Sequence, residues 1–211
     1  MEYFGYGFAP FFMTLCLWLG TLLIFFVFEP FPSYRHIGVS RFASVFGRWP
    51  VHLLMLALEL AAVCGGSIAL GVPHADLAAY IANYCVLGFS FMCIMQLLNL
   101  FDIPGKAVAI LILIFQICCG SGTFPVILGA DYAQVITGFL PFTYGIDAFR
   151  EILSGGNLAV AYADMGRVLL FAAGAVALTL LVYPRALKLK MRRDRETLAS
   201  LSAMPAADGR R

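Results

Sequence analysis

Apolar residues fill long runs of the chain, short polar stretches separate the runs, and prolines stand at most of the boundaries. A helix of about 20 predominantly apolar residues is long enough to cross a ~30 Å hydrocarbon core. The runs predict five spans, at residues 7–28, 51–71, 77–101, 107–126 and 167–183. We therefore expect an all-α polytopic membrane protein whose transmembrane domain covers residues 1–186.

The fourth span contains a break. Residues 107–119 are apolar apart from Gln116, and a helix of that length reaches only about 20 Å. Turn-forming residues follow, so we expect the chain to bend back into the outer leaflet through two short helices, at residues 131–139 and 143–153. The candidate hinge or gate residues are Gly120, Ser121, Gly122, Thr123, Phe124, Pro125, Pro141, Tyr144 and Arg150. Two interpretations stay open: a hinge on a translocation path, or a corner that only turns the chain.

The placement of lysine and arginine predicts the orientation. Every basic residue except Arg150 and Arg167 lies in the loop after the first span, in the turn after the third span or in the C-terminal tail. The N-terminus is therefore expected outside and the C-terminus inside, which an odd number of spans allows. Residues 187–211 form a basic cytoplasmic tail whose end we expect to be disordered. The tail follows the positive-inside rule, and binding of a partner or of anionic lipid is the alternative.

The inner loop contains the sequence SRFASVFGRWP at residues 40–50. Its large apolar side chains recur at helical spacing, and its two arginines lie outside that stripe. The pattern predicts a short amphipathic helix on the cytoplasmic face of the membrane. The apolar residues are Phe42, Val45, Phe46 and Trp49, and the arginines are Arg41 and Arg48.

Composition agrees with a membrane protein, because 62% of the residues are hydrophobic and 12% are charged. The charged fraction is about half of that of a typical soluble domain. The six cysteines all lie in apolar runs, so they indicate neither a disulfide framework nor a metal site. The sequence has no phosphate-binding loop, no HExxH and no nucleophile triad. We expect no enzyme activity, no cofactor and no nucleic-acid partner, so any ATP-driven work needs a separate ATPase chain.

Several polar residues lie inside the predicted spans. Glu59 in the second span is either a functional carboxylate or a packing contact that is hydrogen-bonded or protonated. The third span carries polar side chains that serve as hydrogen bonds between helices or as substrate contacts. These residues are Asn83, Ser90, Gln96 and Asn99. Asp147 and Arg150 are three residues apart, a spacing that predicts a local ion pair.

The sequences GSGTFPV at residues 120–126 and LPFTYGIDAFREILSGG at residues 140–156 resemble the C-terminal membrane region of the YhgE/Pip family. This family is named after phage infection protein and is related to the membrane domain of type-2 ABC exporters. Residues 8–20, residues 89–98 and the turn at residues 104–106 also match. The resemblance implies a six-span exporter-like fold, with a coupling helix at residues 40–49 and re-entrant outer helices at residues 120–153.

The sequence also departs from the family pattern. Family members carry a further N-terminal span and a large extracytoplasmic domain, so we expect a fragment, a split gene product or a reduced homologue. Residues 129–132 replace the proline-aromatic motif that relatives often have.

Three functions remain open. The first is a subunit of an ABC type-2-like exporter in the bacterial cytoplasmic membrane, which pairs with a second copy or a related subunit. A separate ATPase would drive it through Arg41, Phe42, Phe46, Arg48 and Trp49. The second is a scaffold or receptor of a cell-surface secretion apparatus, or a phage contact, without transport of its own. The third, a proton-coupled transporter, rests on Glu59 alone.

Overall fold

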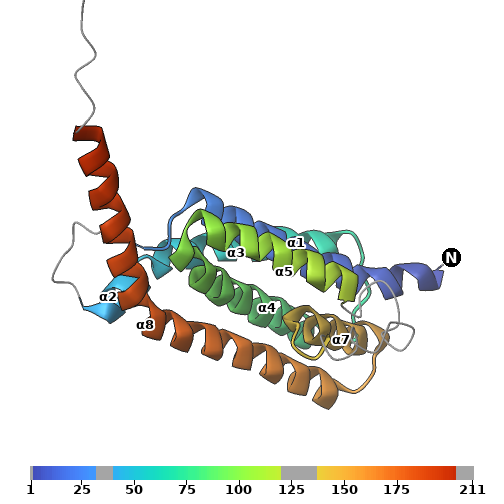
Figure 1. Ribbon diagram of the computed structural model, residues 1–211. Helices are drawn as coiled ribbons and strands as arrows, with labels where there is room; N and C mark the ends of the chain where they lie inside the picture. Colours follow the sequence, from blue (N-terminus) through green and yellow to red (C-terminus); the bar gives the residue numbers. More distant parts are fainter. Residues whose placement is uncertain (1, 32–39, 120–136, 203–211) are drawn as a thin grey trace, which may run out of the picture.

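The computed structural model describes residues 2–31, 40–119 and 137–202, and every regular element in these ranges is a helix (Figure 1). The all-helical prediction is confirmed for this part of the chain. The elements are α1 (Glu2–Val27), α2 (Arg41–Phe46), α3 (Trp49–Ala69), α4 (Leu77–Leu98), the 3-10 helix η1 (Asn99–Phe101), α5 (Ile103–Cys119), α7 (Pro141–Ser154) and α8 (Leu158–Ser202).

Four of the described segments are long and apolar enough to cross a membrane. They are Gly7–Val27, Arg41–Ala69, Leu77–Phe101 and Leu158–Arg192. This supports the prediction of a membrane protein. α5 has 17 residues, or ~25 Å, and is shorter than the predicted fourth span. The remainder of that span, residues 120–126, lies outside the described residues, so the count of five spans stays a prediction.

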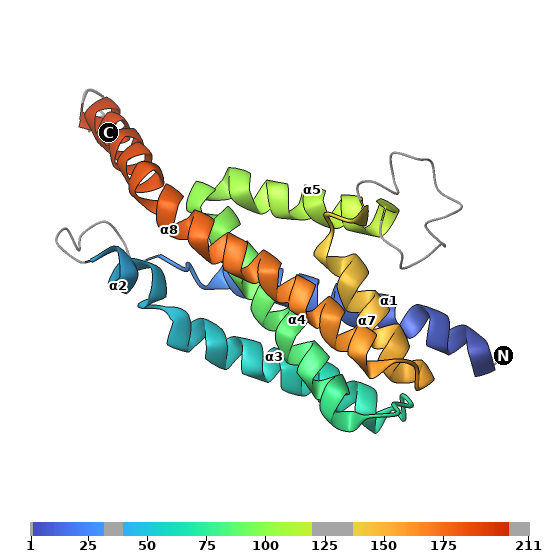
Figure 2. The same ribbon diagram turned by 90° about the horizontal axis from the view of Figure 1, so that it is seen from below.

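α4 is the central helix of the bundle. It packs against α1, α3, α5, α7 and α8, and the two ribbon views agree on this arrangement (Figures 1 and 2). An aromatic cluster joins α4 to α1 and α7: the Trp18 ring lies edge-on to Phe91 at 5.0 Å and to Phe142 at 5.6 Å. All three side chains are fully buried. Large aromatic rings in such contacts contribute strongly to core stability.

α7 follows only part of the length of α4. Its first turn, with Phe142, contacts the middle of α1 and α4, and near its other end the carbonyl of Ile152 accepts the Ala75 N–H at 3.1 Å. Pro141 occupies the first turn, where its missing N–H is tolerated, and Gly155 (φ 69°) ends the helix. The predicted helix at residues 143–153 is confirmed with slightly wider bounds. The predicted helix at residues 131–139 lies almost entirely outside the described residues.

The contacts define two ends of the bundle. We call the end with the α3–α4 loop (residues 70–76) and the last turn of α7 the loop end. The opposite end, which carries α2 and η1, is the α2 end.

α8 differs from the predicted fifth span. It begins at Leu158 and continues through Pro184 to Ser202, whereas the prediction began at residue 167 and placed a boundary at the proline. Its 45 residues are ~68 Å long, about twice a hydrocarbon core. Both views show α8 bending near the α2 end (Figures 1 and 2). Pro184 belongs to this part of α8, because its neighbours Tyr183 and Ala186 line a pocket at the α2 end. Packing of the buried side chains of Tyr183 and Ala186 favours continuation of the helix across the proline.

The predicted amphipathic helix is shorter than expected. α2 ends at Phe46, and Trp49 is the first residue of α3, because Pro50 favours the first turn of a new helix. The buried residues of α2 are Ser44 and Val45, whereas Phe42 is 66% exposed. The predicted stripe is therefore partly confirmed: Val45 and Trp49 pack on the bundle, whereas Phe42 faces outward.

Candidate functional site at the α2 end

Gln96 of α4 attaches α2 to the bundle. Its Nε2 donates to the carbonyl of Val45 at 2.7 Å, and its Oε1 accepts the indole N–H of Trp49 at 2.8 Å. The Gln96 side chain is buried. One amide therefore joins α2, the start of α3 and the inside of α4, and a displacement of α2 would act directly on both longer helices.

The turn between α2 and α3 has a second attachment, to the end of α1. Arg48 donates through Nη1 to the carbonyl of Glu29 at 2.8 Å. The ring nitrogens of His52 lie 2.9 Å from the carbonyl of Arg48 and 3.2 Å from that of Phe28. A neutral imidazole can donate to one of the two oxygens. These contacts fix the turn on α1, so Arg48 has a structural partner within the chain.

The outward side of α2 presents Arg41 and Phe42. Both are exposed, and the ring of Phe42 stacks on Phe46 at 6.2 Å. Phe46 in turn contacts Trp49 edge-on at 4.7 Å. The five predicted coupling residues therefore divide into two groups: Arg48, Trp49 and Phe46 hold α2 in place, while Arg41 and Phe42 face outward.

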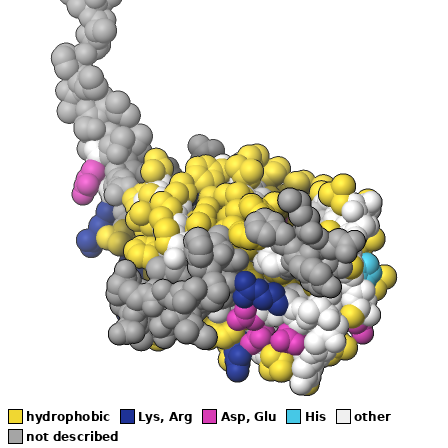
Figure 3. Space-filling model, turned by 90° about the vertical axis from the view of Figure 1, so that its right-hand side faces the viewer, with side chains coloured by type: hydrophobic (Ala, Val, Ile, Leu, Met, Phe, Trp, Pro, Cys, Tyr) yellow, Lys and Arg dark blue, Asp and Glu magenta, His cyan; other side chains and the backbone are white. Residues whose placement is uncertain are grey.

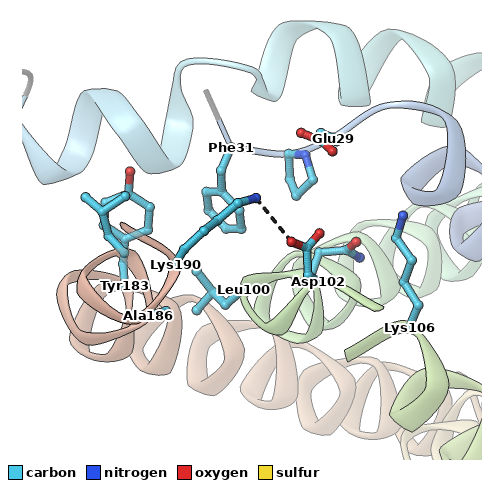
Figure 4. Close-up of a pocket in the computed structure, with 11 residues that line it drawn as sticks. Glu29, Phe31, Leu100, Asp102, Lys106, Tyr183, Ala186 and Lys190 are labelled. Atoms are coloured by element: carbon cyan, nitrogen blue, oxygen red, sulfur yellow. Dashed lines mark ion pairs between the residues drawn. The ribbon is translucent and has the colours of Figure 1, made fainter. Parts of the chain in front are cut away.

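A small pocket lies beside this attachment, between the end of α1, the η1 turn and α8 (Figure 4). Lys190 bridges it, with Nζ 3.2 Å from Oδ2 of Asp102. Both side chains are about half exposed, so the pair contributes at most ~1 kcal/mol. The volume of about 90 Å³ holds only a few waters, at ~30 Å³ each. The pocket is therefore a small polar joint between helices.

Glu59 lies away from this site, in the contact between α3 and α1. Thr21 donates to its Oε2 at 3.3 Å, and its carboxylate lies against Gly20, where any larger side chain would overlap it. Its Oε1 is buried without a partner among the described residues. The geometry is that of a packing contact.

Three of the four polar residues predicted for the third span have hydrogen-bond partners, whereas the buried hydroxyl of Ser90 has none among the described residues. Asn83 donates to the carbonyl of Gly145 in α7 at 3.2 Å, which makes it the predicted link between helices. Asn99, the first residue of η1, donates to the carbonyl of Met95 in the last turn of α4 at 2.8 Å. Gln96 joins α2 and α3, a role that the sequence did not reveal, because its partners lie 47 and 51 residues away.

The predicted hinge residues are only partly described, because residues 120–125 lie outside the described ranges. Pro141 starts α7, and Tyr144 donates its hydroxyl to the carbonyl of Gly138 at 2.8 Å. Arg150 pairs with Asp147 at 3.1 Å, as predicted, and Arg167 pairs with Asp164 at 2.5 Å. Figure 3 views the loop end and shows basic and acidic side chains gathered in one cluster. The charges there are thus of both signs.

Within the described ranges, no group of three His, Cys, Asp or Glu side chains is placed to hold a metal ion. The arrangement at the α2 end consists of hydrogen bonds, aromatic contacts and exposed cationic and apolar side chains. Such a surface is suited to binding another protein.

Sequence comparison provides a distant relative. The chain is 26% identical over 181 residues to "Uncharacterized protein YhgE" of Bacillus subtilis (strain 168). The match covers 84% of this chain and 23% of the length of YhgE. No family model and no solved structure matches the chain. The relationship to YhgE is therefore supported, while the link to type-2 ABC exporters remains a proposal.

Proposed function

We propose that the chain is the membrane-spanning subunit of an exporter related to type-2 ABC exporters, which moves a substrate out across the bacterial cytoplasmic membrane. The N-terminus is outside, α2 and the C-terminus are inside, and the chain pairs with a second copy or a related subunit. A separate ATPase binds at α2, and this chain catalyses nothing itself. The observation that carries the proposal is that α2 is anchored inward through Gln96 while Arg41 and Phe42 are exposed.

The chemistry of the outward side of α2 supports a protein partner. Aromatic side chains and arginine are enriched in protein interfaces and often carry much of the binding energy. Phe42 is 66% exposed and stacks on Phe46, so its ring is held in a defined position. Arg41, next to it, offers a charge for an acidic surface.

The experiment that tests partner binding is affinity purification of the full chain from native membranes in a mild detergent, with quantitative mass spectrometry. The variant Phe42→Ala with Arg41→Glu removes the outward surface of α2. The matched control is Phe12→Ala with Arg195→Glu, which alters an exposed aromatic and an exposed arginine elsewhere. We expect a stoichiometric ATPase with the parent chain and with the control, and its loss with the α2 variant.

Two results would contradict this proposal. Equal recovery of the ATPase with the α2 variant would show that α2 is not its binding site. Recovery of only the chain itself, or of secretion components without an ATPase, would favour the alternative of a scaffold or receptor.

Transmission through α2 is tested with Gln96→Leu. This change removes two hydrogen bonds, worth together about 2 kcal/mol, and leaves the outward surface of α2 unaltered. We expect ATPase recovery to persist and ATP-dependent substrate movement in reconstituted vesicles to be lost. Asn99→Leu is the control. Among the described residues, the Asn99 side chain bonds only to the carbonyl of Met95, four residues earlier, and so joins no other long helix to α4. Normal movement with Gln96→Leu would show that this amide does not transmit the motion.

A further inference from the structure

A groove of about 640 Å³ lies among α1, α4, α5, α7 and α8. It shares no lining residue with the pocket at the α2 end. Its volume falls within the range of ~300–1,000 Å³ that is usual for small-molecule sites. Most of its wall is aliphatic or aromatic, including Leu97 of α4 and Leu178 of α8. A ligand in this groove would therefore be largely apolar.

Two polar side chains line the groove without hydrogen bonds of their own. The Trp18 indole N–H and both ends of the Gln116 amide are buried and have no partner among the described residues. Both side chains are 0% exposed. Buried polar groups in folded proteins are nearly always hydrogen-bonded, and leaving them unpaired costs free energy. Because neither side chain is exposed, a hydrogen-bond acceptor of a ligand in the groove would pair with these N–H groups once the side chains turn toward it.

Arg167 supplies positive charge at the edge of the groove. Its side chain is 57% exposed, one guanidinium nitrogen bonds to Asp164, and the guanidinium lies over the Tyr144 ring at 5.4 Å. A guanidinium has five N–H donors, so the bond to Asp164 leaves donors for a second anionic group. Asp164 offsets part of this charge, but its side chain is only 6% exposed. The charged group exposed at this edge of the groove is therefore the guanidinium of Arg167.

The length of the groove identifies the class of ligand. Along α8 it extends from Arg167 to Leu178, a distance of about 16 Å at 1.5 Å per residue. Half of a ~30 Å hydrocarbon core is about 15 Å, the depth of the acyl chains in one leaflet. An anionic group at Arg167, an apolar tail of one-leaflet length and a buried acceptor are the features of a phospholipid.

We propose that one acyl chain of a membrane phospholipid lies in this groove, with the phosphate at Arg167 and the ester carbonyl at the N–H groups of Trp18 and Gln116. The proposal concerns lipid binding by this chain alone. It holds or fails independently of ATPase binding and export.

The fluorescence of Trp18 provides a direct test. The chain has two tryptophans, so Trp49→Phe leaves Trp18 as the sole emitter. The full chain with this change is purified in a mild detergent and titrated with phosphatidylglycerol whose acyl chains carry bromine, which quenches indole fluorescence at short range. We expect quenching that saturates and that unbrominated phosphatidylglycerol reverses.

Two glycines of α8 give a matched pair of variants in the same background. A Cβ added at Gly174, which lines the groove, or at Gly166, which does not, meets no described atom within 4 Å. Gly174→Leu places a side chain in the groove and should abolish the saturable quenching. Gly166→Leu makes the same change elsewhere on α8 and should preserve it. Gln116→Leu removes one donor and should weaken the apparent affinity about fivefold, the ratio for one net hydrogen bond.

Three results would overturn the proposal. The first is a folded Trp49→Phe chain whose Trp18 fluorescence is not quenched by the brominated lipid. This would show that no lipid chain enters the groove. The second is quenching that rises without saturation, as expected for the general lipid surroundings of the bundle. The third is equal loss of quenching with Gly174→Leu and Gly166→Leu. Circular dichroism of each variant verifies that the helices remain folded.

Discussion

At the scale of single residues, Asp102 has an unusual backbone conformation. Its φ of 58° and ψ of −131° resemble the first central position of a type II′ turn, where glycine is favoured. The residue turns the chain from η1 into α5: its N–H donates to the carbonyl of Asn99, and its carbonyl accepts the N–H of Lys106. Backbone strain is therefore localised beside the pocket at the α2 end.

We predict that Asp102→Gly is more stable to unfolding than Asp102→Ala by about 1 kcal/mol. Glycine relieves strain of ~1–3 kcal/mol, and its greater freedom in the unfolded chain cancels part of the gain. Both variants lose the ion pair with Lys190, so the comparison isolates the backbone. Thermal unfolding in detergent measures the difference, and an alanine variant of equal or higher stability would rule out strain at this turn.

At the scale of elements, α4 and α7 approach closely at Gly145. A Cβ at this position would come within 3.0 Å of Cδ1 of Leu87, whose side chain is fully buried. The same close approach brings the carbonyl of Gly145 to the side chain of Asn83 at 3.2 Å. The absence of a side chain at Gly145 is thus what permits this helix contact.

We predict that Gly145→Ala lowers the free energy of unfolding by about 1 kcal/mol. Overpacking costs ~1–3 kcal/mol, and the better helix propensity of alanine returns up to ~1 kcal/mol. In a Leu87→Ala background the space is available, so the same change should cost nothing. Unfolding of the four variants of this double-mutant cycle gives the coupling. Additive effects would mean that Leu87 is not the residue that the new methyl group meets.

At the scale of the whole molecule, the basic side chains are divided between the two ends. Arg48, Lys106 and Lys190 belong to the α2 end, where Arg48 reaches the end of α1 and Lys190 bridges to the η1 turn. The described basic residues of the loop half are Arg150 and Arg167, and each pairs with an aspartate. The positive-inside rule then favours an inner α2 end.

We predict that this orientation is visible by thiol labelling of whole cells. The background replaces the six native cysteines with alanine, and single cysteines are introduced as Ser154→Cys in α7 or Lys188→Cys in α8, both exposed positions. A membrane-impermeant maleimide should label Ser154→Cys in intact cells and Lys188→Cys only after permeabilisation. The reverse pattern would invert the topology.

The sequence determined the features that depend on neighbouring residues. Apolar runs of sufficient length set the helices, because backbone groups inside a membrane must be hydrogen-bonded within the segment. Pro50 and Pro141 mark helix starts, because a proline lacks the N–H that the interior of a helix uses. The ion pair of Asp147 and Arg150 followed from their spacing alone.

Only the tertiary structure decided which distant residues meet. The bonds of Gln96 to Val45 and Trp49 and the groove that Trp18 shares with Gln116 join residues far apart in sequence. α8 also continues through Pro184, because packing against the bundle outweighs the tendency of a proline to end a helix. Local patterns fix where helices form, since each helix satisfies its own backbone. The register in which helices pack depends on side-chain contacts that exist only after they assemble.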